Sequence, residues 1–317
     1  AVTDSVMEVK LGSNTQTFTG ATYTYGYGHG ILHIVEATGL NPKTEYEVRV
    51  GDGSGHMSGW QPFKTAPVPS DQCEPYRFVV MGDSRSTTTD GASIWWSTVL
   101  DAATDFEDPG DPDPDFLLMN GDLIAEGDQQ DGWDDWFDKS GSHLSRLPFL
   151  AIWGNHDHRT PELLMHQFAQ FTNDVTGTED FYSFRYGNGL FLVLDTEHGT
   201  TSMADQGTWI DNQVAANTDA IWKFTLQHRS PYNAGTSHGC DDDVQTYFVP
   251  HFDSNHIDVD FGSHEHVYTR TCFINNGACV SSADQGTLYL VTGGAGAFMN
   301  PIYNPFEWFL KKYNGIM

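Results

Sequence analysis

Polar and apolar positions alternate along the first part of the chain. Residues 44–50 alternate with a period of two, a glycine-rich stretch at residues 51–55 interrupts them, and residues 60–65 begin another such run. This alternation predicts strands with one side facing solvent. Helical periodicity does not occur in the segment. We therefore expect residues 1–67 to form a small β-sandwich, followed by a stiff, proline-containing linker at residues 66–70.

From Tyr76 onward the pattern changes to short apolar runs, each ending in polar residues or glycine, with helical candidates between them. The apolar runs cover residues 77–81, 115–119, 149–153, 190–194, 223–227, 257–261 and 287–291. The helical candidates are residues 92–104, 161–171 and 206–216. Strands that alternate with helices predict a layered α/β domain.

The run at residues 149–153 shows most clearly where the chemistry is expected. It stops at Gly154, and Asn155, His156 and Asp157 follow directly. An apolar run that ends in a turn signal is typical of a buried strand. Open α/β sheets bind their ligands just beyond the carboxyl ends of such strands. The three polar residues are therefore candidates for a functional site.

Other strand ends deliver polar side chains of the same kind, and together they predict a metal centre. The candidate ligands are Asp83, Asp122, Asn155, His228, His264 and His266. A metal ion is the natural counter-charge for carboxylates and imidazoles that converge away from water. Mixed oxygen and nitrogen ligands favour zinc, iron, manganese or cobalt over calcium. One carboxylate can bridge two such ions, which is the arrangement that phosphoryl hydrolysis uses.

In this order the motifs resemble the five blocks of calcineurin-like metallophosphoesterases. The blocks are Gly82-Asp83, Gly121-Asp122, residues 154–157, His228 and residues 264–266. The purple acid phosphatase branch fits best, because residues 227–232, 264–270 and 286–294 resemble its later segments. The resemblance covers nearly the whole chain. It implies two sheets flanked by helices, an αββα sandwich, in residues 71–317.

The β-rich segment at residues 1–67 is similar to a fibronectin type III domain, which precedes the catalytic domain in that branch. Residues 40–46 resemble the corner in which a tyrosine, here Tyr46, ties a strand to a loop. The segment is shorter than a typical domain of this type, which is consistent with truncation at its first strands.

The resemblance also implies a role for each candidate ligand. Asp122 would bridge two metal ions. Asp83 and His266 would complete the first site, and the other three residues would form the second. The nucleophile would be a metal-bound hydroxide. His156 would act on the substrate, by stabilising the phosphoryl group or protonating the leaving group, with Asp157 as the acid that tunes it.

Two positions depart from the family pattern, and both concern the first site. Arg85 stands where many members have a histidine ligand, and Ala125 stands where purple members have a tyrosine. The coloured ferric phenolate should therefore be absent. Arg85 stays protonated and cannot bind a metal. It could bind a phosphate in bidentate fashion or simply pair with a nearby acid. Further residues that could line the pocket are His158, Arg159, His198 and His238.

The composition limits the kinds of partner that the protein can bind and the compartment in which it is expected. The formal net charge of −28 argues against binding to nucleic acid or anionic lipid, and is typical of a highly soluble secreted or salt-adapted protein. No apolar stretch reaches the roughly 18 residues that span a bilayer. A chain that begins with Ala1 is consistent with a mature exported protein. Of the four cysteines, Cys272 and Cys279 could close a hairpin, which leaves Cys73 and Cys240 to pair.

These observations lead to three hypotheses about function. The first is a secreted (extracellular or periplasmic) dinuclear metal phosphatase that hydrolyses phosphomonoesters. The second is a phosphodiesterase or nucleotide hydrolase of the same superfamily. The third is a binding or adhesion protein whose catalysis is weakened by the incomplete first site. The natural substrate, the metal identity among iron, zinc, manganese and cobalt, the oligomeric state and the completeness of the C-terminus stay open.

Overall fold

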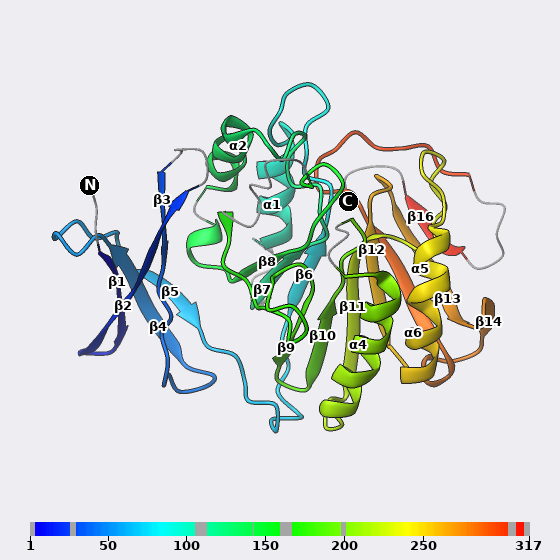
Figure 1. Cartoon of the computed structure of the whole chain (residues 1–317), viewed down its shortest axis with the longest axis horizontal. Coiled ribbons are helices and arrows are strands. Elements are labelled where there is room, and N and C mark those ends of the chain that lie inside the picture. The colour runs from blue at the N-terminus through cyan, green and yellow to red at the C-terminus, as the bar shows by residue number, and fades with distance from the viewer. Residues whose placement is uncertain are drawn as a thin grey trace.

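The computed structural model describes residues 4–25, 30–104, 113–141, 143–158, 167–197, 201–303 and 309–313. An all-β region lies at one end of the molecule and a layered α/β body makes up the rest (Figure 1). Within the part of the chain that is described, no helix is both long and apolar enough to cross a membrane.

The N-terminal region is an antiparallel sheet of five strands in the order β3-β2-β1-β4-β5. The strands are β1 (Ser5–Leu11), β2 (Asn14–Tyr25), β3 (Gly30–Ile34), β4 (Glu45–Gly51) and β5 (Gln61–Lys64). Strand β2 pairs with β1 up to Gly20 and with β3 from Ala21 onward, so it passes between two partners. The Tyr46 hydroxyl accepts a hydrogen bond from the Asn41 amide at 2.9 Å, which ties the strand to the preceding loop. The predicted all-β character is confirmed.

The first sheet of the α/β body is small and parallel. Its strands are β6 (Phe78–Met81), β7 (Phe116–Met119) and β8 (Phe149–Ala151), in the order β6-β7-β8. Helices α1 (Trp96–Thr104) and α2 (Gln130–Ser140) cover one face. Trp96 of α1 stacks on Trp136 of α2 with ring centroids 5.6 Å apart, and both indoles are fully buried.

The second sheet is larger and mixed, with the order β14-β13-β15-β12-β11-β10-β9 and β16 paired to β13. Its strands are β9 (Tyr182–Tyr186), β10 (Gly189–Val193), β11 (Trp222–Arg229), β12 (Val259–Ser263), β13 (Tyr268–Asn275), β14 (Ala278–Val280), β15 (Thr287–Thr292) and β16 (Phe309–Tyr313). Its outer face is covered by α4 (Met203–Ala216), α5 (Asp242–Tyr247) and α6 (Val249–Asn255). The short helical turns η2 (His143–Ser145) and η3 (Ala283–Gln285) lie in connections.

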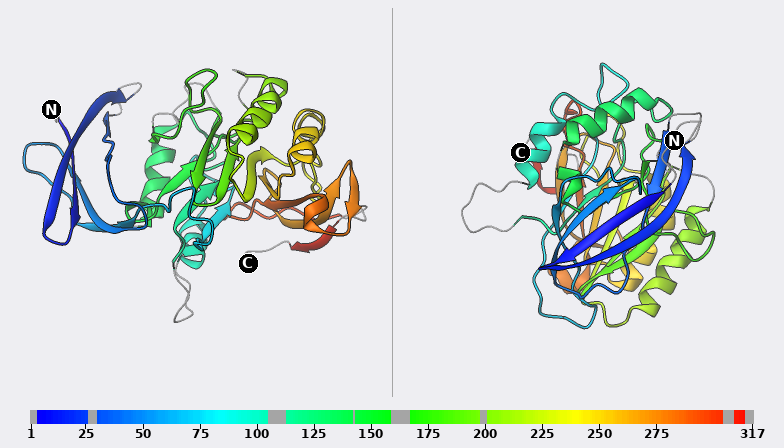
Figure 2. Two further views of the ribbon diagram at one scale, coloured as in Figure 1. Left: turned by 90° about the horizontal axis from the view of Figure 1, so that it is seen from below. Right: turned by 90° about the vertical axis from the view of Figure 1, so that its left-hand side faces the viewer.

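The two sheets pack face to face over an aromatic core, and Figure 2 shows helices on both outer sides. Phe78 stacks on Phe116 with ring centroids 5.3 Å apart, and Phe191 stacks on Phe224 at 4.8 Å. The αββα arrangement is therefore confirmed. Since β10, β11, β12 and β15 are parallel to one another, as are β6, β7 and β8, several strands end together at one edge of each sheet.

Most predicted elements occur within a few residues of their expected places. Helices expected at residues 92–104 and 206–216 correspond to α1 and α4. The helix expected at residues 161–171 lies mostly outside the described residues. Helix α2 was not predicted, because its acidic residues hide the buried Trp133 and Trp136. The boundary between the two regions, placed at residues 67–71, stays a prediction.

One of the two expected disulfides is present. Cys272 and Cys279 are bonded across the β13–β14 hairpin. Pairing of Cys73 with Cys240 was wrong, since both are free thiols. Cys73 is exposed in the segment that precedes β6, whereas Cys240 is half-buried and its sulfur accepts a hydrogen bond from the Asn233 amide.

Candidate metal centre

Loops from both sheets meet at one place and bring together the six predicted ligands. The small sheet contributes Asp83 after β6, Asp122 after β7 and Asn155 after β8. The large sheet contributes three imidazoles from the ends of β11 and β12, namely His228, His264 and His266. Two groups of side chains there have ligand atoms close enough to share a metal ion, and Asp122 belongs to both.

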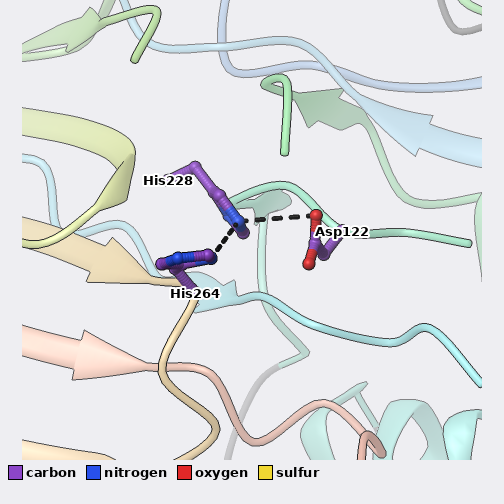
Figure 3. A group of neighbouring side chains, drawn as sticks. All are labelled: Asp122, His228 and His264. Carbon is purple, nitrogen blue, oxygen red and sulfur yellow. Dashed lines mark hydrogen bonds and ion pairs between the residues drawn. The ribbon is translucent and has the colours of Figure 1, made fainter. Parts of the chain in front are cut away.

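One group, which corresponds to the predicted second site, consists of Asp122, His228 and His264 (Figure 3). His228 Nε2 lies 3.4 Å from Asp122 Oδ1 and 3.1 Å from His264 Nδ1. Asn155 Oδ1 is 3.2 Å from the same His228 nitrogen, which adds a fourth donor. His228 Nδ1 donates to the Asn120 carbonyl at 2.7 Å, so Nε2 of the neutral ring carries the lone pair that faces the group.

The other group, which corresponds to the predicted first site, consists of Asp83, Asp122 and His266. Asp83 Oδ1 lies 3.4 Å from His266 Nε2, and both atoms are buried without a hydrogen-bond partner among the described residues. His266 Nδ1 donates to the Phe298 carbonyl at 2.8 Å, which leaves the Nε2 lone pair facing Asp83. Two orphaned, buried acceptor atoms that face each other fit a cation between them.

The backbone of these loops is held in an unusual conformation. Asp83, Asp122 and His264 have φ values of 63°, 54° and 68°, in the left-handed region that residues with side chains rarely adopt. Each such residue costs about 1–3 kcal/mol, and such strain concentrates at functional sites. Gly154 allows the loop after β8 to approach the loop after β7, because a Cβ at this position would collide with Asp122.

Burial shapes the charge state of the side chains around the two groups. Burial, followed by repulsion from His228, lowers the pKa of His264, which keeps its imidazole neutral and able to bind a cation. Burial and then the neighbouring Asp122 carboxylate raise the pKa of Asp157 to about 8.

His156 lies beside the bridging position. Its backbone amide donates to Asp122 Oδ1 at 2.9 Å, and its Nδ1 lies 2.7 Å from the Ala125 carbonyl. Because a carbonyl can only accept, Nδ1 must carry the proton, and Nε2 of the neutral ring is the basic atom.

Asp157 was expected to tune the imidazole of His156, but the structure places the Ala125 carbonyl at that position. The Asp157 carboxylate is fully buried and accepts hydrogen bonds from backbone amides instead. Oδ1 accepts from Leu123 at 2.9 Å and Oδ2 from Gly154 at 3.0 Å. Asp157 therefore joins the loops that follow β7 and β8. Residues 155–157 form a turn, in which adjacent side chains point in different directions, so sequence adjacency alone could not place the Asp157 carboxylate against the His156 ring.

Arg85 lies at the first site. Its Nε donates to Asp122 Oδ2 at 3.1 Å, and its side chain is 15% exposed. The second reading of the sequence, an arginine paired with a nearby acid, is thus the arrangement present. One of the remaining guanidinium nitrogens donates a long hydrogen bond to the Ser86 carbonyl at 3.4 Å.

His238, which the sequence could not rank above a surface residue, lies against the centre. Its ring packs against that of His264 in a tilted arrangement, with centroids 3.9 Å apart. The fully buried Glu265 fixes this loop, since its carboxylate accepts from the amides of Ser237 and His238 at 3.0 and 2.7 Å. The His-Glu-His spacing could have indicated Glu265 as an inward-facing acid.

The other flanking candidates add little to the centre. The ring of His158 packs against that of Trp153 in a tilted arrangement, with centroids 5.7 Å apart. Arg159 and His198 lie outside the described residues.

Comparison with known proteins agrees with this geometry. Residues 76–268 match the calcineurin-like phosphoesterase family. The chain belongs to this family. Residues 2–65 of this calcineurin-like phosphoesterase match the purple acid phosphatase N-terminal domain, which confirms the branch that the motifs indicated.

Individual relatives come from the same branch. The chain is 26% identical to purple acid phosphatase 15 of Arabidopsis thaliana over 85% of its own length and 54% of that protein. It is 24% identical to the probable inactive purple acid phosphatase 24 of the same plant, over 86% of this chain and 50% of the relative. The chain thus spans about half the length of these curated relatives. A purple acid phosphatase isolated from yellow lupin seeds, PPD1, has the same fold, with a TM-score of 0.81 and 21% identity over 98% of this chain and 63% of that one.

Proposed function

We propose that this protein is a dinuclear metal-dependent phosphatase that hydrolyses phosphomonoesters. The observation that carries the proposal is the position of Asp122, which belongs to both candidate ligand groups and can bridge two cations. Asp83 and His266 would complete one site, and Asn155, His228 and His264 the other. Bound cations supply Lewis acidity to the phosphoryl oxygens and lower the pKa of water.

The protein's own side chains account for binding and proton transfer. Arg85, held beside Asp122, would bind a phosphate oxygen through its remaining N–H groups. His156 would protonate the leaving-group oxygen from Nε2, since the Ala125 carbonyl fixes the ring through Nδ1. Asp157 would act through the loops that it joins and would not contact the substrate.

The residues present also bear on the identity of the metal and on the compartment in which the protein works. Imidazole, carboxylate and amide donors suit iron, zinc, manganese or cobalt. Ala125 cannot supply a phenolate, so we expect an iron form without the purple colour. The Cys272–Cys279 disulfide supports export to an oxidising compartment, which we propose to be extracellular or periplasmic.

Removal and return of metal test the proposal. We expect the purified protein to hold two ions per chain by elemental analysis and to lose monoester hydrolysis on chelation. Activity should return when zinc, manganese or iron is added back. Full activity in the metal-free protein would refute the proposal, and a preference for a diester over the matching monoester would favour a phosphodiesterase.

A catalytically weakened binding protein is the second candidate. One observation favours it: the first site has only three donors among the described residues, and Arg85 occupies the place of a further ligand. One ion or none per chain, with no hydrolysis of any phosphate ester under metal-replete conditions, would support this candidate.

A further inference from the structure

The segment that follows β15 is fastened to the metal centre along its length. Its Ala295 and Ala297 amides each donate at 3.0 Å to the carbonyls of Gly82 and Asp83 respectively. On the other side, the Asn300 amide donates to the His266 carbonyl at 3.0 Å. These bonds run along two of the loops that carry candidate ligands, so the segment has little freedom to move independently of the centre.

Phe298 lies in the middle of this fastened segment. Its carbonyl accepts a hydrogen bond from Nδ1 of His266 at 2.8 Å. Nevertheless its side chain is 79% exposed, the highest value among the large apolar side chains that are described. An exposed phenyl ring on a fixed backbone has no role in the core of the protein.

Two more exposed apolar side chains lie beside the same segment. The Ser93 hydroxyl donates to the Gly296 carbonyl at 2.5 Å and accepts from the Trp95 amide at 3.2 Å. This serine therefore joins the start of α1 to the Phe298 segment. Ile94 and Trp95, which follow it, are 71% and 52% exposed. The exposed apolar side chains Ile94, Trp95 and Phe298 therefore lie on segments that are hydrogen-bonded to each other, and the Phe298 segment is also bonded to the loops of the centre.

We propose that Phe298 is a specificity residue that packs against the organic group of the phosphate ester, and that the preferred substrates carry an aromatic or planar apolar group. The inference rests on the proposed phosphatase function and adds a substrate class to it. The metal centre and Arg85 recognise only the phosphoryl part, which every monoester shares. The ring of Phe298 is the exposed apolar group whose backbone contacts a candidate ligand directly.

The physical argument concerns ordering and water. Because the hydrogen bonds already fix the backbone around Phe298, contact with a substrate ring would immobilise only the phenyl group itself. Stacking two aromatic rings removes apolar surface from water and adds a favourable ring–ring interaction. A small aliphatic ester cannot make this contact. Discrimination should therefore depend on binding and leave the chemical step unchanged.

The experiment compares benzyl phosphate with ethyl phosphate, because both release an alkoxide of similar basicity and differ in the ring. In Phe298→Ala we expect the KM for benzyl phosphate to rise roughly tenfold while kcat is retained. The KM for ethyl phosphate should change by less than about twofold. Phe298→Tyr should restore the wild-type preference. The matched control is Tyr23→Ala, which removes a 53% exposed aromatic from β2 in the N-terminal sheet.

Calorimetric binding of benzylphosphonate and ethylphosphonate gives a readout that does not depend on turnover. Tighter binding of the benzyl compound to the wild type, lost in Phe298→Ala, would support the inference. It would do so even if neither ester were hydrolysed, and that absence of hydrolysis would refute only the proposed phosphatase function. Equal effects on both ligands, no preference in the wild type, or loss of self-association in Phe298→Ala by sedimentation would overturn it.

Discussion

The two sheets of the α/β body contribute different chemistry to the same centre. The small parallel sheet supplies the oxygen donors Asp83, Asp122 and Asn155, and the large mixed sheet supplies the imidazoles. Neither sheet alone holds a complete site, because both candidate groups contain side chains from each. The aromatic core that joins the sheets is therefore also the element that positions the donors.

Asp157, which follows β8 of the small sheet, and Asp260, in β12 of the large sheet, are both fully buried, and they accept hydrogen bonds from different kinds of donor. Asp157 accepts hydrogen bonds from the backbone amides of the small-sheet loops. Asp260 in the large sheet accepts from the side chains of Thr225 and Gln227 on the neighbouring strand. Amide donors are fixed by the fold, whereas hydroxyl and amide side chains can reorient. This difference predicts that the small sheet depends on its carboxylate more than the large sheet does.

Removal of the shared ligand should have the largest effect. We expect Asp122→Asn to lose both ions and to lower kcat on the order of 10³-fold, since both sites lose their bridge. Elemental analysis and monoester kinetics measure the two losses. Asp138→Asn on the exposed face of α2 is a control that leaves the centre intact. Retention of two tightly bound ions in Asp122→Asn would contradict the bridging role.

Removal of single imidazoles should separate the two sites. His266→Ala leaves its group with Asp83 and Asp122, whereas His264→Ala leaves Asp122, Asn155 and His228. We therefore expect about one ion per chain in His266→Ala, because two donors hold a metal poorly.

His264→Ala should keep its ion with weaker affinity. Metal content after dialysis against graded chelator distinguishes the variants. A greater loss in His264→Ala than in His266→Ala would mean that Asn155 is not a ligand.

Loss of the small-sheet carboxylate should weaken the centre without removing a ligand. In Asp157→Asn one acceptor oxygen becomes an NH₂ group that faces a backbone N–H. We expect about 1–3 kcal/mol lower stability and a 10–100-fold loss in metal affinity. Denaturation and metal titration measure these effects. Unchanged metal affinity would show that the loops hold their positions without Asp157.

The sequence was sufficient to predict which polar residues come together but could not predict how their neighbours connect. Buried parallel strands bring polar residues at their ends to one edge, so the run that ends at Gly154 was informative by itself. The backbone groups that form hydrogen bonds with these side chains could not be predicted in this way. That the Ala125 carbonyl holds His156, and that Asp157 faces Leu123, depend on loops that meet only in three dimensions.

Similar reasons explain the other differences. His238 is ten residues from His228 and carries no pattern, yet Glu265 in the loop after β12 fixes the His238 loop against His264. The pairing of Cys73 with Cys240 was inferred by elimination, which assumes that every cysteine is bonded, whereas both are free thiols. The six ligand assignments, the domain boundary and the role of Arg85 stay predictions until the variants are measured.

Asp260 should have the smallest effect on the metal centre, and it gives the clearest test of the contrast between the two sheets. Burial raises the pKa of Asp260 to about 7, despite hydrogen bonds from Thr225 at 2.6 Å and Gln227 at 2.8 Å. Because the folded pKa exceeds the unfolded value, the native state holds a proton between about pH 4 and pH 7. Its contribution to stability is therefore complete below about pH 4 and is lost as the pH rises through 7.

Asp260→Asn should remove this loss, because the neutral amide needs no proton and both partners can adapt. Thr225 can accept as well as donate, and Gln227 Oε1, which lacks a partner among the described residues, can turn to accept from the new NH₂ group. We expect the variant to gain up to roughly 4 kcal/mol over the wild type between pH 4 and pH 8, with metal content unchanged. Chemical denaturation at several pH values measures the difference. A variant that is less stable than the wild type at pH 8, as Asp157→Asn should be, would show that the large sheet needs its carboxylate just as much.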